Sequence, residues 1–222
     1  MTGGLLKRYD TFIFDLDGTI TRVKLARLLN EKLNPGWNYR KWKHKAQMDP
    51  YSTEIPNPKT IRGREIRRHI MEKEIENEIL SKLVDVSLLF VKPRLQSDTL
   101  KVLQRLRKGG AKVALFTNAD SYRAMKDLHY LKIGDYFSAI VSAQGIGTIK
   151  PNPLGIKLTL KQLHSKKERA IYVCDMVSDV EAAKYAGVAS CAISQGFDTY
   201  RQLRGARPTY LMRSMEELLK SL

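Results

Sequence analysis

The feature that most constrains this chain is a series of short apolar runs separated by segments with a helical pattern. Five runs occupy residues 12–14, 111–116, 138–142, 170–174 and 188–193. Such runs, apolar without alternation, are typical of strands buried on both faces of a sheet. Four segments between them have a helical pattern: 99–108, 121–131, 154–163 and 179–185. The spacing places Leu100, Leu103 and Leu106 on one face of the first segment, and Met125, Leu128 and Leu131 on one face of the second. This alternation predicts an α/β fold, a Rossmann-like, doubly wound parallel sheet with helices on both faces.

The alternation is interrupted once, between the first run and the second. Residues 22–92 contain no convincing strand, and they include two helical patterns, at 24–33 and 61–83, with a proline-containing connector between them. We therefore expect a core domain made of residues 1–21 and 93–222. We expect residues 22–92 to form an inserted, small α-helical cap domain over the sheet.

The positive charge of the chain is concentrated in the predicted insertion. The whole chain carries 39 basic and 23 acidic residues, a formal net charge of +16, and residues 22–68 alone hold 13 basic and 4 acidic residues. A basic segment attracts phosphates, nucleotides or nucleic acid through its field. The same charge also suits a solvated surface, and the segment contains no recognised nucleic-acid motif. Nucleic-acid binding is therefore a weakly supported alternative.

Several broad classes are disfavoured by composition. The hydrophobic fraction of 43% is that of a globular protein. No apolar run approaches the roughly 18 residues that span a bilayer, and no leader pattern opens the sequence. We expect a cytoplasmic protein, a monomer or homodimer, that does not enter the membrane. Cys174 and Cys191 lie in apolar runs, so we interpret them as small core residues.

Polar residues follow the predicted strands at the point where each strand ends. Because the carboxyl ends of parallel strands meet at one edge of a sheet, these side chains should lie together. Carboxylates without thiolates or nearby imidazoles favour a hard cation, Mg²⁺ over Zn²⁺. A metal, a lysine and hydrogen-bond donors around a carboxylate nucleophile would form a phosphoryl-transfer site. The residues concerned are Asp15, Asp17, Thr117, Asn118, Lys150, Asp175 and Asp179.

Taken in chain order, these segments resemble the four motifs of the haloacid dehalogenase-like hydrolase superfamily. The segments are Asp15-Leu-Asp17-Gly18-Thr19, Thr117 after its strand, Lys150-Pro151-Asn-Pro153 and Asp175-Met-Val-Ser-Asp179. The position and helical pattern of the insertion resemble the phosphoglycolate phosphatase-like branch, whose helical cap lies between the first and second motifs. Any one aspartate alone is also a common turn or helix-cap residue. The resemblance rests on all four segments together.

The resemblance implies a role for each matched residue. Asp15 would be the nucleophile that forms an aspartyl-phosphate, and Asp17 the acid and base of the two half-reactions. Thr117 and Lys150 complete the catalytic set. The implied substrate-binding residues are Gly18, Thr117, Asn118 and Lys150. The implied Mg²⁺ ligands are Asp15, the backbone carbonyl of Asp17, Asp175 and Asp179, the last of which could instead orient Lys150.

Asp17 also discriminates between the reactions of this superfamily. The dehalogenase members lack an acid two residues after the nucleophile, whereas an alkoxide leaving from phosphorus needs a proton. The chain is therefore predicted to be a Mg²⁺-dependent phosphatase of small phosphorylated metabolites, such as phosphoglycolate or a nucleoside monophosphate. A phosphomutase of the β-phosphoglucomutase type and a nucleotide- or nucleic-acid-directed phosphatase remain alternatives. Cys174 departs from the family pattern, because glycine is usual before the aspartate of the fourth motif.

Overall fold

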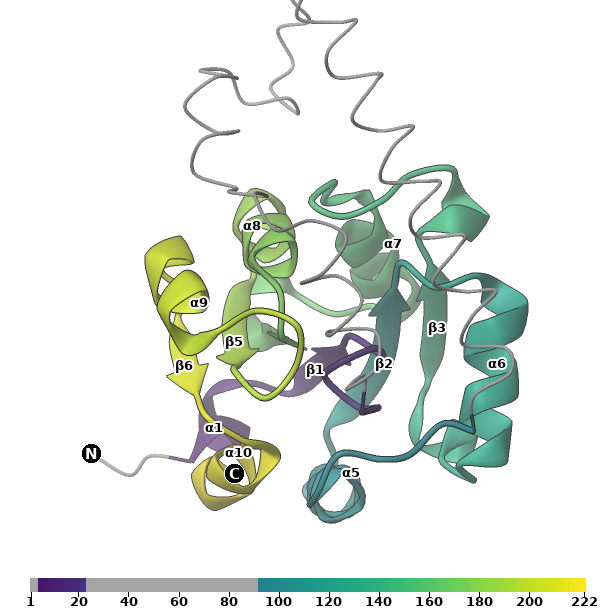
Figure 1. The fold of residues 1–222 in the computed structure, drawn as a ribbon, viewed down its shortest axis with the longest axis horizontal. Coiled ribbons are helices and arrows are strands. Elements are labelled where there is room, and N and C mark those ends of the chain that lie inside the picture. The colour runs from purple at the N-terminus through teal and green to yellow at the C-terminus, as the bar shows by residue number, and fades with distance from the viewer. Residues whose placement is uncertain (1–3, 23–91) are drawn as a thin grey trace, which may run out of the picture.

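The computed structural model of the chain describes residues 4–22 and 92–222, which contain a single six-stranded, fully parallel sheet (Figure 1). The strand order is β3-β2-β1-β4-β5-β6, so the first strand lies at the centre. The strands are β1 (Thr11–Phe14), β2 (Lys112–Thr117), β3 (Ala139–Ser142), β4 (Ala170–Cys174), β5 (Ala189–Ile193) and β6 (Tyr210–Met212). The predicted Rossmann-like, doubly wound α/β fold is confirmed.

Two helical layers cover the sheet, each closing its own hydrophobic cluster (Figure 1). Phe12 and Phe14 of β1 point into one cluster and Ile13 points into the other, as the two-residue period of a strand requires. The first cluster is closed by α1 (Leu5–Arg8), α5 (Thr99–Lys108), α6 (Ser121–Tyr130) and α10 (Met215–Ser221). The second is closed by α7 (Leu154–Gln162), α8 (Val177–Ala186) and α9 (Tyr200–Ala206).

The central strand fixes where the two halves of the sheet end. Thr11 pairs with Lys112 of β2 on one side and with Ala170 of β4 on the other. All four residues of β1 are buried, which explains why residues 12–14 are all apolar. Because the three strands start in register, the residues that follow them emerge at the same edge of the sheet.

Helix α5 has the predicted bounds but not the predicted inner face. Leu103 and Leu106 are fully buried, whereas Leu100 is 40% exposed and Val102 is buried in its place. In α6, Met125 is likewise turned outward and 54% exposed. The spacing of apolar residues therefore located these helices but assigned Leu100 and Met125 to the wrong face.

Both cysteines, Cys174 and Cys191, are free and buried in the core, as predicted. The predicted cap, residues 22–92, lies outside the described residues except for its two ends, and so does most of the basic segment. No described helix is long and apolar enough to cross a bilayer.

Candidate active site

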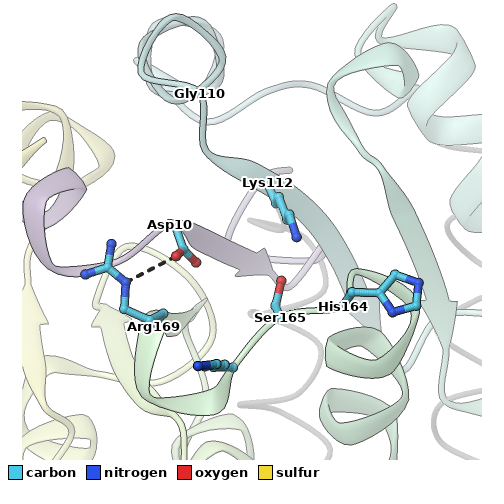
Figure 2. A pocket seen from close by; sticks show the side chains of 7 residues that line it. Asp10, Gly110, Lys112, His164, Ser165 and Arg169 are labelled. Carbon is cyan, nitrogen blue, oxygen red and sulfur yellow. Dashed lines mark hydrogen bonds and ion pairs between the residues drawn. The ribbon is translucent and has the colours of Figure 1, made fainter.

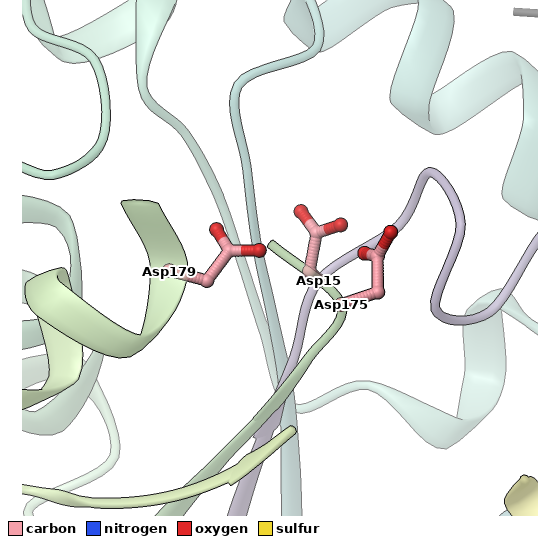
Figure 3. A group of neighbouring side chains, drawn as sticks. All are labelled: Asp15, Asp175 and Asp179. Atoms are coloured by element: carbon pink, nitrogen blue, oxygen red, sulfur yellow. The ribbon is translucent and has the colours of Figure 1, made fainter. Parts of the chain in front are cut away.

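Three aspartates meet at the carboxyl edge of the sheet (Figure 3). Asp15 directly follows β1, Asp175 directly follows β4, and Asp179 lies in the first turn of α8. All three are buried, and a carboxylate oxygen of each lies within 4.8 Å of one from each of the others. The edge predicted from the strand ends thus gathers carboxylates from two segments far apart in the sequence, the end of β1 and the connection from β4 into α8.

Lys150 brings a positive charge into this cluster from the loop before α7. Its ammonium Nζ lies 2.5 Å from Asp15 Oδ1 and 2.7 Å from Asp179 Oδ1. It also donates to the hydroxyl of Tyr172 at 3.0 Å, and that hydroxyl donates to the Phe116 carbonyl. Lys150 is buried, so its side chain is held in one place by three polar partners.

The charges of the cluster do not balance. Three buried carboxylates face one ammonium group, and taking charge out of water without compensation is costly. The described cluster contains carboxylate oxygens and neither a thiolate nor an imidazole, which is the donor chemistry of a hard cation. The residues present therefore fit a divalent metal ion held by Asp15, Asp175 and Asp179.

The pKa values follow from this imbalance. Burial raises the pKa of Asp15 to about 7; Lys150 opposes the shift, and the charge of Asp179 adds to it. Burial, together with the charges of Asp15 and Asp179, raises the pKa of Asp175 well above its usual range. Burial alone would lower the pKa of Lys150, yet the charges of Asp15 and Asp179 outweigh it and raise that pKa. The lysine therefore stays charged.

Two hydrogen bonds and two glycines closely surround the carboxylate of Asp175. The hydroxyl of Thr19 donates to Oδ1 at 2.8 Å, and the backbone N–H of Phe197 donates to Oδ2 at 2.7 Å. Gly18 has a φ of 86°, and a Cβ at Gly18 or Gly196 would lie within 2.2 Å of Asp175 Oδ2. Glycine is needed at both positions because the chain there passes directly over the carboxylate.

The match to known families agrees with this geometry. Residues 12–193 match the model of the haloacid dehalogenase-like hydrolase family. The chain belongs to this family. The matched region begins at the strand that precedes Asp15 and ends with β5, so it includes every residue of the buried cluster.

Relatives of this chain carry phosphatase names. It is 33% identical over 122 residues to phosphoglycolate phosphatase 1 of Pseudomonas aeruginosa, covering 55% of this chain and 44% of that protein. It is 30% identical over 119 residues to pyrophosphatase PpaX of Halalkalibacterium halodurans, covering 54% and 55%. The chain thus spans about half the length of the curated relatives it matches. A predicted phosphatase from Clostridium acetobutylicum has the same fold: the TM-score is 0.66 at 20% identity, covering 96% and 97%.

The remaining predicted site residues surround the cluster in different ways. Asn118 accepts a hydrogen bond from the backbone N–H of Lys150 at 3.0 Å, so it holds the lysine loop. The hydroxyl oxygen of Thr117 accepts from the backbone N–H of Ala119 at 3.1 Å. Asp179 also caps α8, because its Oδ2 accepts from the backbone N–H of Met176. The helix-cap interpretation is therefore correct for Asp179, alongside its contact with Lys150.

Asp17 is placed differently from the other three aspartates. Its carboxylate lies outside the three-aspartate cluster and forms an ion pair with Arg123 of α6. Arg123 is buried, and it was not among the residues predicted from the sequence. Its pairing with Asp127 at i,i+4 on the inner face of α6 was the only available signal. The implied coordination of a metal by the Asp17 backbone carbonyl stays a prediction.

The side chain of Cys174 points into the core. It is fully buried in the second hydrophobic cluster, together with Ile13 and Tyr172. Burial raises the pKa of its thiol well above the ordinary value. The departure from the family's usual glycine is thus accommodated within the core.

A separate pocket of about 430 Å³ lies at the opposite, amino edge of the sheet (Figure 2). It is lined by Asp10, Gly110, Lys112, His164, Ser165, Lys166 and Arg169. Figure 2 shows Arg169 turned toward Asp10, to which it lies at 3.1 Å. None of the sequence-predicted site residues lines this pocket.

Proposed function

We propose that this chain is a Mg²⁺-dependent phosphatase that hydrolyses a small phosphate monoester through an aspartyl-phosphate on Asp15. The observation that carries the proposal is the buried cluster of three carboxylates in contact with the ammonium group of Lys150. Membership of the haloacid dehalogenase-like hydrolase family and relatives named phosphatases support it.

Asp15, Asp175 and Asp179 would hold the Mg²⁺ ion, with the backbone carbonyl of Asp17 as a further ligand. When bound, the ion supplies positive charge that offsets the carboxylates and the phosphoryl oxygens. Asp175 suits a ligand role because Thr19 and Phe197 fix both of its oxygens. Lys150 keeps its charge and lies against Asp15, so it would neutralise both the nucleophile and the incoming phosphoryl group.

The two half-reactions use Asp15 and Asp17. A carboxylate oxygen of Asp15 attacks phosphorus, the bond from phosphorus to the ester oxygen breaks, and Asp17 gives that oxygen a proton. A water molecule then attacks the phosphorus of the aspartyl-phosphate while Asp17 takes a proton from it. Free phosphate and the Asp15 carboxylate result. Thr117, Gly18 and Asn118 would line the phosphate position.

Phosphoglycolate and nucleoside monophosphates are the substrates we consider first. The relative named pyrophosphatase PpaX adds pyrophosphate as a second candidate. The phosphomutase and nucleic-acid-directed alternatives depend on residues 22–92, and so stay predictions. At the described end of that insertion, Arg22 donates from Nε to the Leu95 carbonyl at 3.0 Å.

A substrate panel tests the proposal. Phosphoglycolate, pyrophosphate, nucleoside monophosphates and p-nitrophenyl phosphate are each incubated with the protein in Mg²⁺ and in excess chelator, and released phosphate is measured. We expect release from at least one compound, only in Mg²⁺ and not by the Asp15→Asn protein. Absence of release from every compound, or equal release by Asp15→Asn, would contradict it. Hexose-phosphate isomerisation without net release would favour the phosphomutase.

A further inference from the structure

The ion pair between Asp17 and Arg123 has the geometry of a fixed clamp. The two terminal nitrogens of Arg123 reach the two oxygens of Asp17: NH1 lies 3.2 Å from Oδ1, and NH2 contacts Oδ2. A planar guanidinium that donates to both oxygens fixes the plane of a carboxyl group, which a single contact does not. The two residues are 106 positions apart in the sequence.

The guanidinium is itself held in position. Its NH1 donates to Asp127 Oδ2 at 3.1 Å, one turn along the same helix. The backbone N–H of Arg123 and that of Tyr122 donate to the side chain of Asp120, the N-cap of α6. The Arg123 side chain is 3% exposed and that of Asp127 is 7% exposed. Arg123 therefore lies in the first turn of a capped helix, and its guanidinium is shielded from solvent.

The two hydrogen bonds from Arg123 restrict how the carboxyl group of Asp17 can turn. Oδ1 accepts from Arg123 NH1 at 3.2 Å, and Oδ2 accepts from Arg123 NH2. The hydroxyl of Thr21 lies 3.4 Å from Oδ1, but it is closer to the Leu16 carbonyl, at 3.2 Å, and its single proton can serve only one of the two acceptors. Among the residues that the structure describes, the guanidinium is therefore the group that holds the plane of the Asp17 carboxyl group.

We propose that Arg123, supported by Asp127, is a positioning residue that fixes the plane of the Asp17 carboxyl group for its two proton transfers. This inference rests on the proposed phosphatase function. The proton passes from the Asp17 carboxyl group to the departing ester oxygen, and later from the attacking water back to the Asp17 carboxylate. Arg123 acts only through Asp17 and does not contact the phosphoryl group.

The test compares two substrates that differ in their need for that proton. One is an alkyl phosphate that the wild type hydrolyses, whose alkoxide must be protonated as it leaves. The other is p-nitrophenyl phosphate, whose aryloxide leaves as a stable anion. The readout is kcat/KM, which reports the steps up to departure of the alcohol, so later hydrolysis of the aspartyl-phosphate does not enter.

We expect Arg123→Met and Asp17→Asn to lower kcat/KM for the alkyl phosphate by about 100-fold or more, the scale of general acid catalysis. For p-nitrophenyl phosphate, we expect a loss of less than about tenfold. Arg123→Lys keeps the charge without the planar fork, so its loss should be intermediate; it also serves if Arg123→Met folds poorly. The double variant should be no slower than Asp17→Asn alone, because both changes remove one function.

Lys126→Met is the matched control, because it removes one positive charge from the exposed face of the same helix. Its ratio of the two kcat/KM values should equal that of the wild type. Equal losses on both substrates in Arg123→Met and Arg123→Lys would overturn the inference, since phosphate binding or a general folding defect would cause them. If Asp17→Asn itself shows no selectivity, or the wild type releases no phosphate, the proposed function fails as well.

Discussion

Charged side chains are buried at one edge of the sheet and exposed at the other. At the carboxyl edge, Asp15, Asp175 and Lys150 are buried and lie against one another. At the amino edge, Asp10 and Arg169 form an ion pair whose side chains are 52% and 45% exposed. The pocket of about 430 Å³ is at the amino edge, where water can compensate each exposed charge. We therefore place the candidate active site by the charge held out of water and not by the presence of a pocket.

The same contrast is found at the two ends of β1. Asp10 precedes β1 and Asp15 follows it. Burial opposes ionisation of Asp10, yet the hydrogen bonds from Thr11 and Arg169, together with the charges of Arg169 and Lys112, leave its pKa below the usual value. Burial instead raises the pKa of Asp15 to about 7. The two aspartates therefore form a matched pair, and the predictions below use the amino edge as the control for the carboxyl edge.

The largest expected effect is on turnover. Asp15→Asn should lower kcat for phosphate release by about 10⁴-fold or more, because removal of a nucleophile leaves only binding and electrostatic contributions. Asp10→Asn should leave kcat within about twofold, since Asp10 lies at the opposite edge and touches no site residue. Initial rates on the best substrate of the panel measure both. Similar losses in the two variants would remove the distinction between the edges.

The next effect is on folding stability without metal. Lys150→Met leaves three buried carboxylates without their cation and should cost about 3–5 kcal/mol in the free energy of unfolding. Arg169→Met breaks an exposed pair and should cost less than about 1 kcal/mol. Urea denaturation in excess chelator measures both values. A Lys150→Met protein as stable as the wild type would mean that the buried charges are compensated in another way.

An effect of similar size is expected in the pH dependence of stability. The pKa of Asp15 is raised in the folded state, so between about pH 4 and 7 the metal-free folded protein binds more protons than the unfolded chain. Wild-type stability relative to Asp15→Asn should therefore fall as pH rises through this window, by up to about 1.4 kcal/mol per unit. Urea titrations at several pH values measure it, and a flat difference would refute the raised pKa.

Asp10 should show the opposite sign. Its pKa is lowered in the folded state, so it contributes stability above its unfolded pKa and loses it as pH falls through the folded value. Because the residue is largely exposed, we expect only a few tenths of a kcal/mol between wild type and Asp10→Asn. The same urea titrations measure the difference. A loss of this contribution on raising the pH would reverse the assignment.

Much of the fold could be predicted from local patterns. Apolar runs marked five strands because strands buried on both faces leave no room for polar side chains. The sixth, β6, escaped notice because it has three residues and only Met212 is buried. The outward turn of Leu100 could not be predicted, since spacing defines a helical face but not the direction in which that face points.

The site was predictable where local chain order determines it and unpredictable where it depends on distant contacts. Asp15 and Asp175 could be placed because each directly follows a central parallel strand. Arg123 and Tyr172 could not, because their partners Asp17 and Lys150 are far away in the sequence. Tyr172 also lies within an apolar run, where nothing in the sequence pattern indicates that its hydroxyl bonds Lys150.

The most direct test of the central claim is a calorimetric titration of the chelator-treated protein with Mg²⁺. The account predicts that the wild type and Asp10→Asn bind one ion per chain with the same affinity, whereas Asp175→Asn binds none in the same range. Bound metal should also stabilise the wild type by about 2.7 kcal/mol when its concentration is 100 times the Kd. Undiminished binding by Asp175→Asn, or no binding by the wild type, would contradict the account.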